Sequence, residues 1–259
     1  MSRTGLWDSH AHLDDQAFAP DRNELIAKIG QELEGVINPG CDEPSSAFAV
    51  ELAEKYDFIY AAVGYHPEDL KGIKTNYLDQ LAKWAAHPKV VAIGEIGLDY
   101  YWKENEPKEV QKKILLEQID LAKQFNLPVI IHDREAHGDM LDIFQHQVKG
   151  VNAVFHCFSG SLEMAKELAK RGYYFGFGGT STYKNSKKVR EVLCYVPKEL
   201  ILLETDSPYL SPVPFRGKRN NPLYVEYTAK NMGLLLDMSM EEVAALTAAN
   251  MRRLFKKLK

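Results

Sequence analysis

The chain has 259 residues, a formal net charge of −4 and 45% hydrophobic residues, and its sequence isoelectric point is near 6.1. This acidic balance excludes a protein that holds nucleic acid by bulk electrostatics, although it leaves room for a local basic patch. The sequence has no apolar run of membrane-spanning length and no basic leader followed by an apolar stretch, so we expect a cytoplasmic protein without membrane contact.

The three cysteines, Cys41, Cys157 and Cys194, are odd in number and widely spaced. They lack a Cys-X-X-Cys pair, so neither a disulfide framework nor a zinc finger is indicated. We expect buried free thiols.

Apolar or β-branched runs alternate with helical patterns along the whole chain. The predicted strands cover residues 5–13, 35–41, 58–65, 90–98, 127–132, 153–158, 173–178 and 200–203. Stretches with helical periodicity lie between them, for example at 23–33, 110–125, 162–171 and 187–195, and two more follow the eighth strand at 222–236 and 239–258. Ser239 and Glu242 form a capping-box pattern at the start of the last helix.

Eight strand and helix units in one chain of this length predict an α/β fold with parallel strands, the (β/α)8 TIM-type barrel. No linker or low-complexity segment divides the sequence, so we expect a single domain, 1–259. A doubly wound open sheet is the alternative architecture. In a barrel the active site lies at the carboxyl ends of the strands, which directs attention to polar residues there.

His10 and His12 lie two residues apart on the first predicted strand. Strand side chains alternate between faces, so both imidazoles point the same way and can bind one metal ion. The alternative is a pair of structural histidines. His132 and His156 come at the ends of later strands, where they would complete a second metal site.

Glu95 is a carboxylate inside the apolar run at 90–98. An ionised carboxylate in such a place is costly unless it is paired or bound to a metal, and its two oxygens allow it to bridge two ions. Asp206 follows the eighth predicted strand, which neighbours the first in a closed barrel. It can bind the same metal as His10 and His12 or orient the attacking water; the alternative is a helix cap or Asx-turn.

Strand alternation also indicates two outer carboxylates. Asp8 shares a face with His10 and His12, and Glu204 shares one with Asp206. We expect each to hydrogen-bond a metal-binding histidine and fix its tautomer, or else to pair with a buried basic group.

Six motifs in order resemble the TatD family of metal-dependent deoxyribonucleases, which belongs to the amidohydrolase-like metal-dependent hydrolases. They are Asp-Ser-His-Ala-His-Leu at 8–13, Gly-Tyr-His-Pro at 64–67, Gly-Glu-Ile-Gly-Leu-Asp at 94–99, His-Asp-Arg at 132–134, His-Cys-Phe-Ser-Gly at 156–160 and Glu-Thr-Asp-Ser-Pro at 204–208. The resemblance implies a (β/α)8 barrel with one or two divalent ions. It also implies the metal ligands, namely His10, His12, Glu95, His132, His156 and Asp206.

The resemblance implies hydrolysis of DNA, as a 3′–5′ exonuclease on single strands, with RNA as an alternative substrate. Two ions would activate a water for in-line attack on the phosphodiester, with Glu95 bridging them and Asp206 accepting the proton. His66, in the Gly-X-His-Pro loop, fits a phosphate contact; its alternative is a turn residue ahead of Pro67. Four histidines suit zinc, manganese or nickel, while the carboxylates also admit magnesium.

Basic residues supply candidate substrate contacts. Arg134 offers a planar bidentate donor two residues beyond His132, with a surface salt bridge as the alternative. Arg216, Lys218 and Arg219 lie with Phe215 in a basic loop after the eighth strand, which could hold a nucleic-acid backbone or be a solvated charge run.

Two other functions stay open from the sequence. A hydrolase of small esters, amides or misacylated tRNA would use the same barrel and metals, because an activated water attacks carbonyl carbon as readily as phosphorus. A metal-binding protein without catalysis is the third. Nothing in the sequence indicates an obligatory protein partner.

Overall fold

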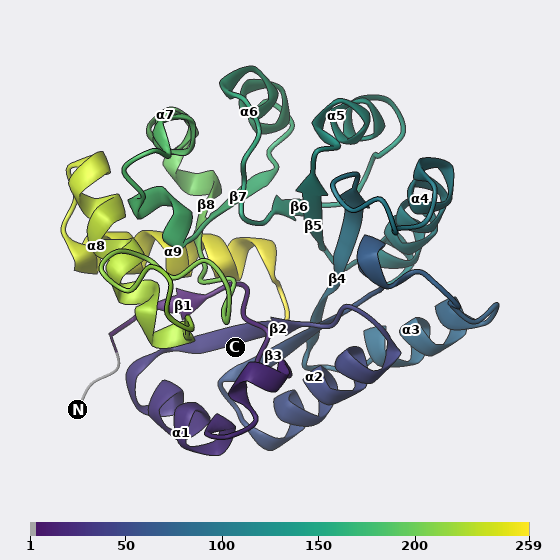
Figure 1. The fold of residues 1–259 in the computed structure, drawn as a ribbon, viewed down its shortest axis with the longest axis horizontal. Helices are drawn as coiled ribbons and strands as arrows, with labels where there is room; N and C mark the ends of the chain where they lie inside the picture. The colour runs from purple at the N-terminus through teal and green to yellow at the C-terminus, as the bar shows by residue number, and fades with distance from the viewer. Residues whose placement is uncertain (1–3, 259) are drawn as a thin grey trace.

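The computed structural model describes residues 4–258, and within them eight parallel strands form one sheet in chain order, β1 to β8. The strands are β1 Trp7–Asp8, β2 Gly35–Pro39, β3 Ile59–Val63, β4 Val90–Asp99, β5 Val129–Arg134, β6 Ala153–Phe155, β7 Tyr174–Phe177 and β8 Ile201–Leu203. Figure 1 shows these strands at the centre with the helices around them. A strand order without reversal excludes the doubly wound sheet. The predicted barrel is confirmed.

The barrel closes between the segments that follow β8 and β1. The Ser9 amide donates to the Leu203 carbonyl at 2.9 Å, and Ala11 forms a parallel bridge with Ser207. The strand predicted at 5–13 is therefore too long as a regular element. Beyond Asp8 the chain leaves the β2 ladder and pairs irregularly with both neighbours, since the Ala11 amide still donates to the Ile37 carbonyl.

The helices lie in the connections between strands and after β8 (Figure 1). They are α1 Arg22–Glu32, α2 Glu43–Lys55, α3 Tyr77–Ala85, α4 Lys108–Gln124, α5 His137–His146, α6 Leu162–Ala169, α7 Lys187–Tyr195, α8 Val225–Leu236 and α9 Met240–Leu254. The capping box of Ser239 and Glu242 is present at α9, which packs against β8 and β1. None of the helices in the described part of the chain combines the length and the apolar character needed to cross a bilayer.

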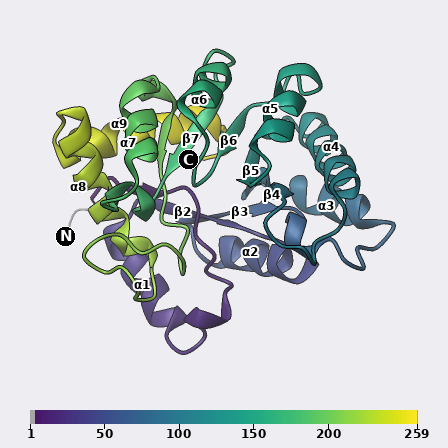
Figure 2. The same cartoon turned by 45° about the horizontal axis from the view of Figure 1, so that its top comes forward.

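Short 3-10 helices lie in the strand-to-helix connections, at η1 Gln16–Phe18, η2 Pro67–Asp69, η3 Gly179–Thr182 and η5 Pro222–Tyr224. Another, η4 Lys198–Leu200, lies between α7 and β8. The turned view in Figure 2 brings the long segment between β8 and α8 forward, beside the segment that joins β1 to α1. These two segments are hydrogen-bonded through Arg219 and the Ala17 carbonyl at 2.7 Å.

Strands β4 and β5 pack closely against each other in the barrel. All ten residues of β4 are buried, as a strand covered on both faces requires. Gly97 is required there, because a Cβ at this position would clash with the carbonyl oxygen of His132 on β5. All three cysteines are free, as expected, but the expected burial is not met. Cys41 and Cys157 are half-buried, and Cys194, on the outer helix α7, is exposed.

Candidate metal centre

The predicted metal ligands converge from five strands at one mouth of the barrel. His10 and His12 follow β1, Glu95 lies within β4, and His132 lies within β5. His156 comes directly after β6, and Asp206 comes three residues after β8. His10, His12, Glu95 and His156 are buried, each at most 9% exposed, so this polar group lies inside the protein.

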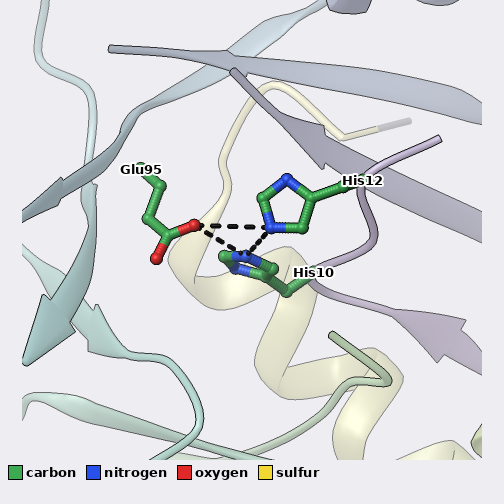
Figure 3. A group of neighbouring side chains, drawn as sticks. All are labelled: His10, His12 and Glu95. Atoms are coloured by element: carbon green, nitrogen blue, oxygen red, sulfur yellow. Dashed lines mark hydrogen bonds and ion pairs between the residues drawn. The ribbon is translucent and has the colours of Figure 1, made fainter. Parts of the chain in front are cut away.

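His10, His12 and Glu95 form a compact group in which the three side chains point toward one another (Figure 3). The Nε2 atoms of His10 and His12 lie 3.1 Å apart. Oε2 of Glu95 lies 3.1 Å from His10 Nε2 and 3.5 Å from His12 Nε2. Two imidazole nitrogens at this distance need a shared proton or a cation between them, so the donor set fits a metal ion.

The other oxygen of Glu95 faces a second group of histidines. Oε1 lies 2.7 Å from His156 Nε2, 3.0 Å from His132 Nδ1 and 3.4 Å from His66 Nε2. The two oxygens of one carboxylate therefore serve two separate clusters of nitrogen donors. This is the arrangement that a bridging carboxylate requires.

Asp206 lies beside the first group. Its Oδ1 is 3.8 Å from His10 Nε2 and 3.6 Å from His12 Nε2. Asp206 adopts a left-handed conformation, with φ 55°, and its amide donates to the His10 carbonyl at 2.9 Å. With this backbone bond, the carboxylate lies beside the two histidines. The position of Asp206 therefore suits a metal ligand better than it suits the residue of an Asx-turn.

The electrostatics of the centre are those of buried acids among imidazoles. Burial alone raises the pKa of Glu95, but His156, His10 and His66 outweigh it and hold that pKa well below its usual range. Burial also lowers the pKa of His10 to about 4. For Asp206, the hydrogen bond from His12 and the nearby histidines outweigh burial and lower the pKa. Both carboxyls are therefore ionised at neutral pH.

Asp99 is a member of this centre to which the sequence analysis assigned no role. Its Oδ2 lies 2.9 Å from His132 Nε2, and the side chain is fully buried at the end of β4. Burial lowers the pKa of His132, but hydrogen bonds to Asp99 and Glu95 outweigh it and raise that pKa to about 10. Strand alternation could have identified Asp99, because positions 95, 97 and 99 share one face of β4.

The expected bonds from Asp8 and Glu204 to imidazole rings are absent among the described residues. Asp8 instead accepts from the backbone amides of His10, at 3.1 Å, and Thr205, at 2.9 Å. Glu204 accepts from the Cys157 amide at 2.5 Å. Both expectations are therefore corrected: these two carboxyl groups accept from backbone amides in the segments that follow β1, β6 and β8, and not from any imidazole nitrogen in residues 4–258.

A cavity of about 840 Å³ opens over the centre. Glu95, His132, His156 and Asp206 line it, together with His66 and Arg134. His66 takes part in the turn that the sequence offered as its alternative role, since its Nδ1 accepts from the Glu68 amide at 3.2 Å. Its Nε2 nevertheless faces the centre. Arg134 forms no ion pair with any residue in the range 4–258. The alternative role of Arg134 in a surface salt bridge is therefore not observed.

The basic loop lies apart from the centre. Arg216, Lys218 and Arg219 are not among the residues that line the cavity. Arg219 is paired with Asp21 through two bonds of 2.7 and 2.6 Å, so its guanidinium is not free in this structure, and its contact with phosphate stays a prediction. The fold places the start of α1 beside the basic loop, and the sequence pattern does not predict this contact. Arg216 and Lys218 remain exposed.

Comparison with known proteins agrees with this geometry. Residues 7–256 match the family model described as TatD related DNase. The chain belongs to the TatD family. A TatD relative in Bacillus subtilis, the uncharacterized metal-dependent hydrolase YabD, is 44% identical over 253 residues, which cover 97% of this chain and 99% of YabD. YcfH of Escherichia coli, also named an uncharacterized metal-dependent hydrolase, is 35% identical and is covered to 95%.

Solved structures extend the TatD comparison to three dimensions. YjjV, described as a TatD homolog from Escherichia coli, superposes with a TM-score of 0.90 at 33% identity, and the match covers 98% of both chains. An uncharacterized amidohydrolase from Saccharomyces cerevisiae shares the fold, with a TM-score of 0.84 at 19% identity and coverage of 96% and 99%.

Proposed function

We propose that this TatD protein is a divalent-metal-dependent deoxyribonuclease that hydrolyses phosphodiester bonds as a 3′–5′ exonuclease on single-stranded DNA. The observation that carries the proposal is the position of Glu95, with Oε2 near the His10 and His12 pair and Oε1 near His156 and His132. A carboxylate between two nitrogen clusters suits the two-ion sites of phosphodiester hydrolysis.

The ligands for the ions would be His10, His12 and Asp206 on one side of Glu95, and His132 and His156 on the other. When bound, divalent ions lower the pKa of a coordinated water and offset the charge of the phosphate. The donor chemistry suits manganese, zinc or nickel, and the carboxylates admit magnesium.

Asp206 would accept the proton of the attacking water. Its side chain is only 14% exposed, and its lowered pKa keeps it ionised at neutral pH, as a proton acceptor must be. His66 would donate to a phosphate oxygen. Because its Nδ1 accepts from the Glu68 amide, the neutral ring carries its hydrogen on Nε2, which is directed into the cavity.

Purified protein assayed on end-labelled single strands, with each divalent metal and with chelator, tests the proposal. We expect release of mononucleotides from the 3′ end that depends on metal and is blocked by a 3′-terminal phosphorothioate. Digestion from the 5′ end, or internal cuts alone, would contradict the polarity. Absence of any metal-dependent cleavage of DNA would contradict the nuclease function.

A second candidate, hydrolysis of a carboxylic ester such as an aminoacyl-tRNA, is favoured by the acidic side of the cavity. This side is lined by Asp14, Asp15, Asp42, Glu68 and Asp69. Carboxylates there would attract the ammonium group of an aminoacyl ester, a group that a DNA strand lacks. Faster turnover of aminoacyl esters than of DNA under identical metal conditions would favour this second function.

A further inference from the structure

Two aromatic side chains and one guanidinium gather at the rim of the cavity. Trp102 and Arg134 line it, and Tyr101 lies next to both. The ring centroids of Tyr101 and Trp102 are 4.8 Å apart at an interplanar angle of 87°. The Arg134 guanidinium lies 3.9 Å from the Tyr101 ring centroid and 5.5 Å from that of Trp102. Tyr101 is 50% exposed and Trp102 is 41% exposed.

This Trp102 cluster, defined as Tyr101, Trp102 and Arg134, is tied to the metal centre through one buried side chain. The amides of Tyr101 and Trp102 donate to Oδ1 of Asp99 at 2.9 and 3.3 Å. Oδ2 of the same carboxylate lies 2.9 Å from His132 Nε2. Asp99 and Arg134 are also register partners on β4 and β5. The cluster is therefore held at a fixed position relative to His132.

Charge around the cavity favours this side for a nucleic-acid strand. Arg134 is the only lysine or arginine among the described residues that line it. The acidic residues at 14, 15, 42, 68 and 69 lie in the segments that follow β1, β2 and β3. Asp133 also lines the cavity at the end of β5, but its side chain is only 9% exposed and its Oδ2 lies 2.9 Å from His137 Nδ1. A polyanion is therefore repelled by the side that follows β1, β2 and β3, and it is attracted toward Arg134.

We propose that Trp102 stacks a nucleobase of the bound strand while Arg134, held against Tyr101, contacts the adjacent phosphate; this substrate-binding role rests on the proposed nuclease function. Stacking on an aromatic face is tolerant of sequence because every base has a π-face, and a guanidinium beside the ring binds the backbone. The cluster would thus recognise the nucleotide next to the scissile phosphate by its base, without selecting one base.

The test compares a short oligodeoxyadenylate with the same strand carrying abasic terminal nucleotides. Trp102→Ala should raise KM about tenfold on the intact strand, as expected for loss of one stacked base, and leave kcat/KM on the abasic strand within about twofold. Trp102→Phe should restore most of the loss. The matched control is Tyr195→Ala on α7, where the ring is 50% exposed against 41% for Trp102 but is not among the residues that line the cavity. Equal losses on both strands, or no loss, would overturn the proposal.

Intrinsic fluorescence gives a readout without turnover. Trp102 is exposed, whereas Trp7 is 2% exposed and Trp84 is partly buried. In chelator, the intact strand should quench emission at lower concentration than the abasic strand, and Trp102→Phe should abolish the difference. Indistinguishable titrations in the wild type would overturn the stacking role. Failure of the nuclease function would look different, as absence of cleavage of both strands by the wild type with every metal.

Discussion

Oε1 of Glu95, on β4, and Nε2 of His156, directly after β6, lie 2.7 Å apart inside the barrel. The other oxygen of Glu95 lies 3.1 Å from His10 Nε2. One side chain thus joins residues from the β1 end and the β6 end of the barrel. Without the Glu95 carboxylate, no side chain in the described part of the chain would contact both clusters of nitrogen donors through its two oxygens.

Substitution of Glu95 tests the bridging role. Glu95→Ala should lose at least one bound ion, with a drop in metal affinity larger than the roughly 10–100-fold that an outer contact costs. Glu95→Gln keeps the shape but removes the charge, so it should lose metal as well. Metal content measured after gel filtration is the readout. Unchanged stoichiometry in both variants would contradict a bridge.

Substitution of Asp206 tests proton acceptance. Asn also tolerates the left-handed conformation at this position, where φ is 55°, so Asp206→Asn should keep the fold. We expect kcat to fall about a hundredfold or more, within the range for loss of a general base. The acidic limb of the pH profile should disappear with it. Wild-type kcat in the variant would leave Asp206 a structural residue of the turn.

Neutralising Arg216 and Lys218 together tests the exposed part of the basic loop. If these residues hold the strand away from the centre, the salt dependence of oligonucleotide binding should flatten by roughly 0.7 in log–log slope for each phosphate that the variant no longer binds. Hydrolysis of a small diester should barely change. The measurement is kcat/KM for both substrates over a salt series. Equal losses on the two substrates would identify a structural loop.

Arg219 should act on stability and not on substrate. Its pair with Asp21 is partly exposed, with the side chains 36% and 40% exposed, so Arg219→Ala should lower the free energy of unfolding by only about 1 kcal/mol. Asp21→Asn should lower the free energy of unfolding by a similar amount. The double variant, Arg219→Ala with Asp21→Asn, should lower it by little more than either single variant. Urea denaturation measures all three. A variant of Arg219 that loses oligonucleotide affinity at full stability would restore the phosphate-binding interpretation.

The buried acid Glu204 predicts a pH dependence of the metal-free protein. Burial raises the pKa of Glu204 to about 8, so the folded state binds a proton that the unfolded state releases near its ordinary value of 4.5. Stability therefore falls as pH rises between about 4.5 and 8, by up to about 1.4 kcal/mol per pH unit.

Glu204→Gln removes this pH dependence. The free energy of unfolding of the variant, relative to that of the wild type, should increase from about pH 4.5 to 8 and stay constant above pH 8. Urea denaturation with chelator present measures this difference. A constant difference between the two proteins from pH 5 to 8 would contradict the assignment.

The order of the elements and the identity of the metal-binding candidates follow from the sequence alone. Strand alternation places His10 and His12 on one side, and an ionisable Glu95 in an apolar strand demands a cationic partner. These are local relations, and the structure brings the predicted ligands together. The (β/α)8 prediction rests on the same local alternation, because parallel strands require crossovers.

Contacts between distant segments were decided only by the tertiary structure. Asp8 accepts from the Thr205 amide after β8, and Glu204 accepts from the Cys157 amide after β6, because the register between strands sets which groups lie at the same depth in the barrel. Arg219 meets Asp21 across 198 residues of sequence. Asp99 supports both His132 and the loop with Trp102, a link set by where β4 ends beside β5. Residue type and spacing specify which groups can act, but only the packing of strands and loops determines which atoms meet.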